Sequence, residues 1–314
     1  MPDQPPTVLV APLNWGLGHA TRCVPIIRDL LSQEQRVMIA ADGDALSWLQ
    51  TEFPDLRCIR LQGICIRYSA SGSQAISMLL QIPSMLINSF REHQALKRLI
   101  RQENIVTVIS DNRFGLWNKH IKSIYITHQL MIKTPYRWME PLLWRLHRCV
   151  INRYDECWIP DIKGTGNLSG DLSHKYPLPG NGRFIGWLSR FPVNEVVTIS
   201  KHYHTLCLVS GPEPQRTLFE QQLINQFQHS NQSTLLVRGK PDESREVNTI
   251  GNIDLAAHLT TTEMQAYILD TPIIICRSGY SSLMDLKTLG KEAMLTPTPG
   301  QTEQEYLATL HNRR

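Results

Sequence analysis

Short apolar or β-branched runs alternate with amphipathic stretches along the first half of the chain. The runs cover residues 7–12 (TVLVAP), 36–41 (RVMIAA), 105–111 (IVTVISD), 123–127 (SIYIT) and 156–160 (ECWIP). A continuous apolar run of this length is typical of a strand that is buried on both faces of its sheet. Between the runs, residues 45–52 and 91–102 keep the apolar spacing of a helix. This alternation predicts an α/β fold built on a doubly wound parallel sheet.

The same pattern restarts in the second half, after a stretch bounded by glycine and proline at 182–195 (GRFIGWLSRFPVNE). Further apolar runs follow it at 205–210, 234–237, 272–276 and 292–295. A chain of 314 residues is too long for one ordinary core and suits two domains. We therefore predict two Rossmann-like domains, residues 1–190 and 191–314, joined near residues 186–203.

Composition excludes several classes of protein. The formal net charge of +4 and the pI near 8.7 are too mild to predict a nucleic-acid partner. No segment is long and apolar enough to span a bilayer, and the N-terminal MPDQPPT lacks the features of a signal peptide, so we expect a cytoplasmic protein. The seven cysteines include no C-x-x-C pair and several lie in apolar runs. We expect them to be reduced and structural, with no zinc site.

The turn NWGLGHATR at 14–22 follows the first predicted strand and opens a predicted helix. Gly16 and Gly18 allow a close backbone approach, and the N-terminus of the helix offers unpaired N–H groups, so the turn could receive a phosphate or a substrate oxygen, with Arg22 beside it. A purely structural turn is the alternative. The stretch GLGHAT also nearly matches a dinucleotide fingerprint with Asp42 as the ribose ligand, but Thr21 replaces its third small residue and PLNW delays the first glycine.

Two more turns of this kind follow strands in the second half. Ser210 and Gly211 open SGPEPQR, in which Arg216 could grip a diphosphate. The turn RSGYSSLMD places an arginine, small residues and hydroxyls at a predicted helix start, in the order Arg277, Ser278, Gly279, Ser281 and Ser282. Asp285 lies two helical turns after Ser278, where its carboxylate could bridge two ribose hydroxyls.

The segment RSGYSSLMDLKTLGKEAMLTPTPGQTEQEYLA (277–308) resembles the C-terminal signature of glycosyltransferase family 28, which includes the UDP-N-acetylglucosamine transferase of lipid II synthesis. NWGLGHATR is similar to the G-x-G-H turn of that family, and SDNRFG (110–115) and THQL (127–130) are similar to motifs of one bacterial subgroup. The resemblance implies a GT-B fold, in which two Rossmann-like domains face a cleft. The C-terminal domain would bind the nucleotide sugar and the N-terminal domain the acceptor.

The resemblance also implies roles for individual residues. Asp285 stands where the family has a ribose-binding glutamate, and Gln304 and Glu305 match a Gln-Gln pair that contacts the sugar. It places Ser210, Gly211, Ser278 and Gly279 in turns that face the diphosphate. The shorter aspartate and the second glutamate leave the donor sugar open. Family members run on to a helix that crosses back to the N-terminal domain, and this helix is expected to be missing here.

The implied reaction is inverting transfer of N-acetylglucosamine or a related hexose from a UDP-sugar, with no further cofactor. His19 could take the acceptor proton or only position a ligand, and Asp111 is the rival base, with a turn cap or paired carboxylate as its structural alternative. Helix N-termini and Arg216 or Arg277 would stabilise the leaving group in place of a metal. The D-x-D at 42–44 is interpreted as a helix start capped by Asp44 and not as a metal site.

The segment 131–153 (MIKTPYRWMEPLLWRLHRCVINR) mixes tryptophan, leucine and arginine. Such a mixture suits a membrane interface and an anionic lipid-linked acceptor on the inner face of the plasma membrane, in a cell-envelope role. The alternative is a helix with its apolar stripe in the core and its arginines in solvent. Two other functions stay open, a GT-B epimerase that converts the UDP-sugar alone and a non-catalytic sensor of nucleotide sugars.

Overall fold

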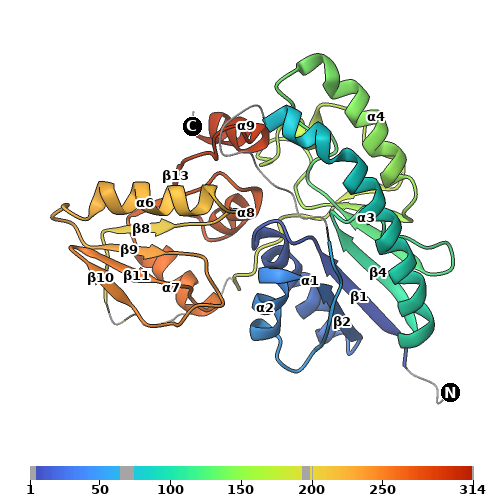
Figure 1. Ribbon diagram of the computed structural model, residues 1–314, viewed down its shortest axis with the longest axis horizontal. Coiled ribbons are helices and arrows are strands. Elements are labelled where there is room, and N and C mark those ends of the chain that lie inside the picture. Colours follow the sequence, from blue (N-terminus) through green and yellow to red (C-terminus); the bar gives the residue numbers. More distant parts are fainter. Residues whose placement is uncertain (1–4, 64–73, 193–198, 200, 313–314) are drawn as a thin grey trace.

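The computed structural model describes residues 5–63, 74–192, 199 and 201–312. Its strands form two sheets, one of seven strands and one of six, which lie next to each other in Figure 1. The fold is therefore GT-B-like, two doubly wound α/β layers, as the alternating pattern predicts. None of the helices in these residues is both long and apolar enough to cross a membrane.

The first sheet has the order β3-β2-β1-β4-β5-β6-β7 and is parallel throughout. Its strands are β1 (Thr7–Pro12), β2 (Arg36–Ala41), β3 (Arg57–Arg60), β4 (Ile105–Asp111), β5 (Lys122–Ile126), β6 (Glu156–Ile159) and β7 (Gly182–Phe184). The helical elements between them are α1 (Gly18–Ser32), α2 (Gly43–Glu52), α3 (Gln74–Glu103), the short η1 (Arg137–Met139), α4 (Glu140–Ile151) and α5 (Asp171–His174). Strand order reverses between β1 and β4, so a crevice opens at their carboxyl ends.

The second sheet has the order β10-β11-β9-β8-β12-β13, and only its edge strand β10 runs antiparallel. Its strands are β8 (Thr205–Leu208), β9 (Thr234–Val237), β10 (Asn248–Ile250), β11 (Ile253–Ala256), β12 (Ile273–Cys276) and β13 (Met294–Leu295). Its helices are α6 (Gln215–Phe227), α7 (Thr261–Asp270), α8 (Tyr280–Thr288) and α9 (Thr302–His311). Strand order reverses here between β8 and β12, which creates a second crevice.

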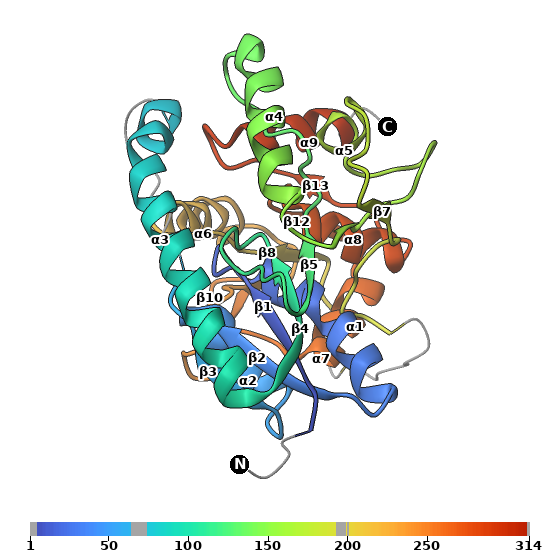
Figure 2. The same ribbon diagram turned by 90° about the vertical axis from the view of Figure 1, so that its right-hand side faces the viewer.

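Apolar residues on both faces of each sheet bury it between helices. On one face of the first sheet Val10 and Ile39 pack in a cluster with Ile27 of α1, and on the other Leu9 packs with Leu96 of α3. The first of these clusters continues into the second sheet, where it includes Leu206 and Ile274. Figure 2 views the molecule from the side of the first sheet, with α3 and α4 toward the viewer. All strands of the first sheet precede residue 190 and all strands of the second follow it, while the division into two domains at that residue stays a prediction.

Some local expectations were wrong. Helix α2 begins at Gly43, and the residue before it is Asp42, so Asp44 lies in the first turn and is not its cap. Residues 182–184, which open the glycine- and proline-bounded stretch and were not predicted as a strand, pair with β6 as β7. Among the described cysteines, positions 23, 58, 149, 157, 207 and 276 carry free thiols, and Cys65 lies outside the described residues.

Candidate active site

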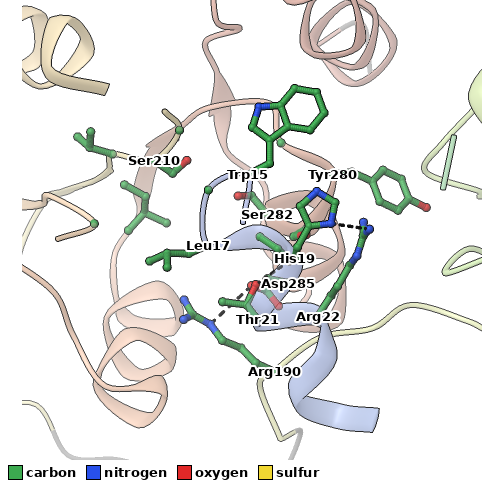
Figure 3. Close-up of a pocket in the computed structure, with 18 of the residues that line it drawn as sticks. Trp15, Leu17, His19, Thr21, Arg22, Arg190, Ser210, Tyr280, Ser282 and Asp285 are labelled. Atoms are coloured by element: carbon green, nitrogen blue, oxygen red, sulfur yellow. Dashed lines mark hydrogen bonds and ion pairs between the residues drawn. The ribbon is translucent and has the colours of Figure 1, made fainter. Parts of the chain in front are cut away.

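A cleft lies between the carboxyl ends of the two sheets. The first sheet contributes the turn after β1 and residues just beyond β4 and β5, and the second contributes the turns after β8 and β12 (Figure 3). Of the residues predicted from sequence, those that line the cleft are Gly16, Gly18, His19, Arg22, Ser210, Gly211, Gly279, Ser282, Asp285 and Gln304. Three strand-end turns from both halves of the chain therefore meet in one cavity.

The N-termini of α1 and α8 meet across this cleft. The hydroxyl of Ser281 donates to the carbonyl oxygen of Gly18 at 2.7 Å. Gly16 has φ +72° and Gly211 φ +109°, backbone conformations that a glycine adopts without strain. The unpaired N–H groups and the positive dipole ends of two helices thus face one space, which suits a diphosphate.

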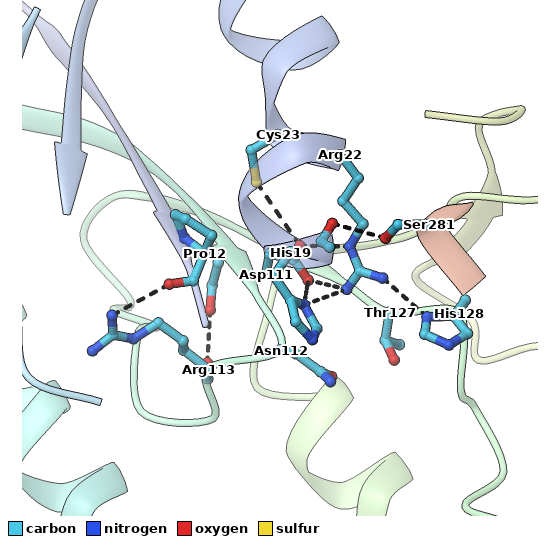
Figure 4. A network of polar contacts seen from close by, with 12 residues as sticks. Pro12, His19, Arg22, Cys23, Asp111, Asn112, Arg113, Thr127, His128 and Ser281 are labelled. Carbon is cyan, nitrogen blue, oxygen red and sulfur yellow. Dashed lines mark hydrogen bonds and ion pairs between the residues drawn. The ribbon is translucent and has the colours of Figure 1, made fainter. Parts of the chain in front are cut away.

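His19 lines the cleft above a buried ion pair. The Arg22 guanidinium binds both carboxylate oxygens of Asp111, with Nε at 2.6 Å from Oδ2, and neither side chain reaches solvent to any extent. Nδ1 of His19 lies 3.1 Å from Oδ1 of Asp111 and 2.9 Å from Nη2 of Arg22 (Figure 4). The structure therefore places the two predicted bases in contact, with His19 at the cleft and Asp111 beneath it.

The groups around His19 and Asp111 determine the charge that each of these two residues carries. Burial would raise the pKa of Asp111, but Arg22 and His19 outweigh it and hold that pKa well below its usual range. Burial and the Arg22 charge lower the pKa of His19. Arg22 and Asp111 make opposite demands on Nδ1 of His19, because a guanidinium only donates and a carboxylate only accepts. Nη2 of Arg22 already donates to Oδ1 of Asp111, so the carboxylate is the partner left for Nδ1 and favours the tautomer with its proton there. In the described part of the chain nothing hydrogen-bonds to Nε2, which is left as a neutral acceptor facing the cleft.

Two residues that sequence analysis did not single out extend this network to α9. Nε2 of His128 lies 2.7 Å from Oε1 of Glu303, and its Nδ1 lies 3.0 Å from Nη1 of Arg22. The His128 ring stacks on Tyr280 with the ring centroids 4.1 Å apart. His128 and Glu303 stand in THQL and TEQEY, but only the fold brings these motifs together.

Asp285 lines the cleft and already has partners from the connection between the sheets. Its Oδ1 accepts from the hydroxyl of Ser189 at 2.7 Å, and its Oδ2 lies 3.8 Å from Nε of Arg190. Burial raises the pKa of Asp285, although Arg190 opposes the effect. Arg190 lies against the rings of Trp48 and Phe191, and its buried Nε has no hydrogen-bond partner in the described residues. Arg190 was not predicted as a site residue, because nothing in the sequence distinguishes a functional arginine within a linker.

Several other predicted residues lie outside the cleft. Each nitrogen of the Arg216 guanidinium already donates within the protein, to acceptors that include Glu213 and Glu220, both at 2.6 Å. The Arg277 guanidinium lies over the Phe219 ring, 3.9 Å from its centroid, and donates to the Pro297 carbonyl at 2.8 Å. Both arginines stabilise loops that connect elements of the second half of the chain, and neither lines the cleft.

Three further predicted residues, Ser278, Glu305 and Asp42, also lie outside the lining of the cleft. The hydroxyl of the fully buried Ser278 donates to the Gln304 backbone carbonyl at 2.7 Å, and the exposed Glu305 accepts from the Gly300 N–H at 2.8 Å. Neither lines the cleft, whereas Glu303 does. Asp42, the ribose ligand of the dinucleotide interpretation, accepts from the Gly63 N–H at 3.0 Å and lines only a neighbouring hollow.

Helix α9 joins the second half of the chain to the first. The Tyr306 hydroxyl accepts from the Asp171 N–H at 2.7 Å, and the Thr302 hydroxyl donates to the Lys133 carbonyl at 2.8 Å. Nε2 of His311 donates to the Leu168 carbonyl at 2.8 Å. Helix α9, which begins within the family signature, contacts the N-terminal half at three separate positions, and the expected absence of a later crossing helix stays a prediction.

Comparisons with known proteins agree with this architecture. The model of the glycosyltransferase family 28 C-terminal domain matches residues 205–310. A search of curated protein sequences found no significant match.

Solved structures of the same fold cover nearly the whole chain. The glycotransferase of kitacinnamycin matches with a TM-score of 0.64 at 14% identity, over 98% of this chain and 84% of that one. A Phytolacca americana UGT2 complexed with UDP-2-fluoroglucose and pterostilbene matches at 0.59 and 14%, over 100% and 84%. S. aureus MnaA with UDP matches at 0.54 and 10%, over 97% and 87%. Residues 205–310 therefore match a glycosyltransferase family 28 C-terminal domain, and the chain has the GT-B fold of two facing Rossmann-like sheets.

Proposed function

We propose that this protein transfers a hexose, N-acetylglucosamine or a related sugar, from UDP to an acceptor hydroxyl with inversion at the anomeric carbon. The observation that carries the proposal is the placement of His19. Its free Nε2 faces the cavity where α1 and α8 present their N-termini, and Asp111 holds it from behind. A base and an anion-binding surface therefore face the same space.

The donor would bind on the second sheet. Its diphosphate would lie at the N-terminus of α8 and the turn after β8, near Gly279, Ser282 and Gly211. Its ribose hydroxyls would bind the Asp285 carboxylate in place of the Ser189 hydroxyl. Arg190 would then be free to bind a phosphate oxygen. The UDP-2-fluoroglucose bound by the plant UGT2 supports a uridine donor for this fold.

The chemistry would be a single displacement. The acceptor oxygen bonds to the anomeric carbon while the bond from that carbon to the β-phosphate oxygen breaks, and the electron pair leaves with UDP. The acceptor proton passes to Nε2 of His19, and Asp111 stabilises the imidazolium that forms. Helix N-termini and Arg190 stabilise the charge on the leaving phosphate, so the proposed mechanism uses no metal ion.

For the acceptor we propose a lipid-linked saccharide at the inner face of the plasma membrane. Trp138, Leu142 and Leu146 at η1 and α4 are 76%, 52% and 56% exposed. The only acidic residue between positions 131 and 153 is Glu140, which is buried and bound to Lys175 at 2.6 Å. An exposed apolar face in a segment rich in arginine, whose one acidic residue is buried, suits an anionic membrane surface. Sedimentation with phosphatidylglycerol vesicles tests this part, and equal recovery with phosphatidylcholine vesicles would contradict it.

The experiment for the proposed activity incubates the protein with UDP-N-acetylglucosamine, with and without a bacterial lipid extract, and follows released UDP and sugar in the organic phase. Acceptor-dependent UDP release with labelled lipid is the expected result. Conversion of the UDP-sugar without acceptor would identify an epimerase instead. UDP binding that is unaffected by His19→Ala, with no turnover under any condition, would identify a sensor.

A further inference from the structure

A continuous chain of polar contacts runs from α9 to His19. Figure 4 shows its part from His128 to His19. Glu303 contacts His128, with 2.7 Å between Oε1 and Nε2, and His128 contacts Arg22, with 3.0 Å between Nδ1 and Nη1. Arg22 binds Asp111, with 2.6 Å between Nε and Oδ2, and Asp111 contacts His19, with 3.1 Å between Oδ1 and Nδ1. The chain thus joins the base on the first sheet to a carboxylate from the second half of the sequence.

Arg22, which can only donate, sets the direction of the hydrogen bond at His128. A guanidinium carries only N–H groups, so Nδ1 of His128 must accept from Arg22. His128 is then neutral, with its proton on Nε2, and it donates to Glu303. The carboxylate of Glu303 also accepts from the Gln129 side chain. Although burial opposes the effect, the hydrogen bond from His128 and the Arg22 charge lower the pKa of Glu303, so this carboxylate is ionised.

We propose that Glu303 is a positioning residue for His19, which acts through His128 and Arg22 to hold the base in place and to stabilise its protonated form. The catalytic consequence rests on the proposed function. The positioning of His19 by Glu303 does not depend on the proposed function, because it is inferred from the contacts alone.

The charges around His19 support this role. The groups that face it are Arg22 on α1, Asp111 at the end of β4, His128 after β5 and Glu303 on α9, with the neutral Cys23 thiol behind Asp111. One cation and two anions surround the imidazole, so the pocket carries a net negative charge when both histidines are neutral. When His19 takes up a proton, that charge is neutralised. Without Glu303, the Arg22 cation would be balanced by Asp111 alone and the imidazolium would be less stable.

The contacts of α9 make Glu303→Gln a selective change. Thr302, Tyr306 and His311 each bind the N-terminal half independently of Glu303, so the helix should stay in place when the charge is removed. Glu305→Gln is the matched control, because it makes the same chemical change two residues further along the same helix, on an exposed side chain outside the cleft.

The test is a histidine titration by long-range proton–nitrogen NMR on the ¹⁵N-histidine-labelled full chain, with the His19 and His128 signals assigned from His19→Gln and His128→Asn. The expected result for wild type is His128 with its proton on Nε2. In Glu303→Gln the His19 midpoint should move to lower pH, while Glu305→Gln should leave it in place. An unmoved midpoint in a folded Glu303→Gln protein would overturn the proposal. This readout needs no substrate, so its failure is distinct from a failure of the proposed transfer.

A second variant covers the case in which Glu303→Gln fails to fold. His128→Asn removes the connecting imidazole and leaves Glu303 in place, and it should lower the His19 midpoint as well. In the His128→Asn background, Glu303→Gln should have little further effect if the influence passes through His128. Full additivity of the two changes would show that Glu303 acts by another route. Once an acceptor is known, the rate should fall about three- to tenfold in Glu303→Gln and not in Glu305→Gln.

Discussion

The Ser281 hydroxyl donates to the Gly18 carbonyl at 2.7 Å, and this contact fixes the N-terminus of α8 against the first turn of α1. A Cβ at position 18 would lie 3.0 Å from the Ser281 oxygen, which is closer than side chains ordinarily approach. The glycine therefore permits two helix N-termini from different sheets to share one cleft. A diphosphate placed there lies at the positive ends of both helix dipoles.

Replacing Gly18 by valine should force the two helices apart. We expect UDP to bind at least about tenfold more weakly, because the unpaired N–H groups no longer converge on the diphosphate. Isothermal titration with UDP measures the effect. Gly180→Val is the control, since a Cβ at position 180 meets no atom within 4 Å. Equal UDP affinity in both variants would show that the helix contact has no part in nucleotide binding.

His19→Gln should remove the base while keeping a polar side chain at the cleft. The expected result is a rate of acceptor-dependent UDP release lower by about 10²- to 10⁴-fold, with UDP affinity within a factor of about three of wild type. A lower rate with nearly unchanged UDP affinity would assign His19 to the chemical step and not to nucleotide binding. A loss confined to UDP affinity, with the maximal rate intact, would assign His19 to ligand positioning instead.

The rate should depend on pH through His19. Transfer needs the neutral imidazole, and burial together with Arg22 lowers the pKa of His19 below its ordinary 6.5. As pH rises through this lowered pKa, the neutral fraction and the rate increase together, so the acid limb should have its midpoint below pH 6.5. Asp111 stays ionised across this range because Arg22 and His19 outweigh its burial and hold its pKa well below the usual value. A midpoint above 6.5 in the profile of kcat/KM would contradict this assignment.

Arg190 and Arg216 should behave differently although both are arginines near the cleft. Arg190→Gln should weaken UDP binding about tenfold, because its Nε has no hydrogen-bond partner among the described residues and lies 3.8 Å from Asp285 at the cavity. Arg216→Gln should leave UDP affinity nearly unchanged, since the guanidinium is already bound to Glu213 and Glu220. Titration of both variants with UDP gives the comparison, and the reverse order of affinities would restore Arg216 as the phosphate ligand.

Structural features set by residues close together in the chain can be predicted from the sequence, whereas contacts between distant residues cannot. Strands β1, β2 and β4 were predicted to the residue, because their apolar runs are continuous and buried on both sides. Strands β3, β7, β10 and β11 were not predicted. The first three are short and partly or fully exposed, and the four-residue β11 has Asp254 within its apolar run. The strand-end turns were found because glycine and hydroxyl residues mark them locally.

The partners of the charged residues could not be predicted in the same way. Nothing local shows that Arg216 and Arg277 are used within the second sheet, or that Arg22 is bound to Asp111, which lies 89 positions further along the chain. The contact between Glu303 and His128 spans 175 positions. Such pairings depend on how the two sheets meet, and a motif carries no information about that.

The most direct test of the account is the melting temperature of the protein with and without UDP, compared for wild type, Asp285→Asn and Glu305→Gln. A ligand at about 100 times its Kd stabilises the native state by about 2.7 kcal/mol, which corresponds to a rise of several degrees. The rise is expected in wild type and Glu305→Gln and should be lost in Asp285→Asn, because the proposed donor site binds the ribose through Asp285, which lines the cleft. The absence of any rise with UDP, or an equal rise in Asp285→Asn, would contradict the proposed donor site.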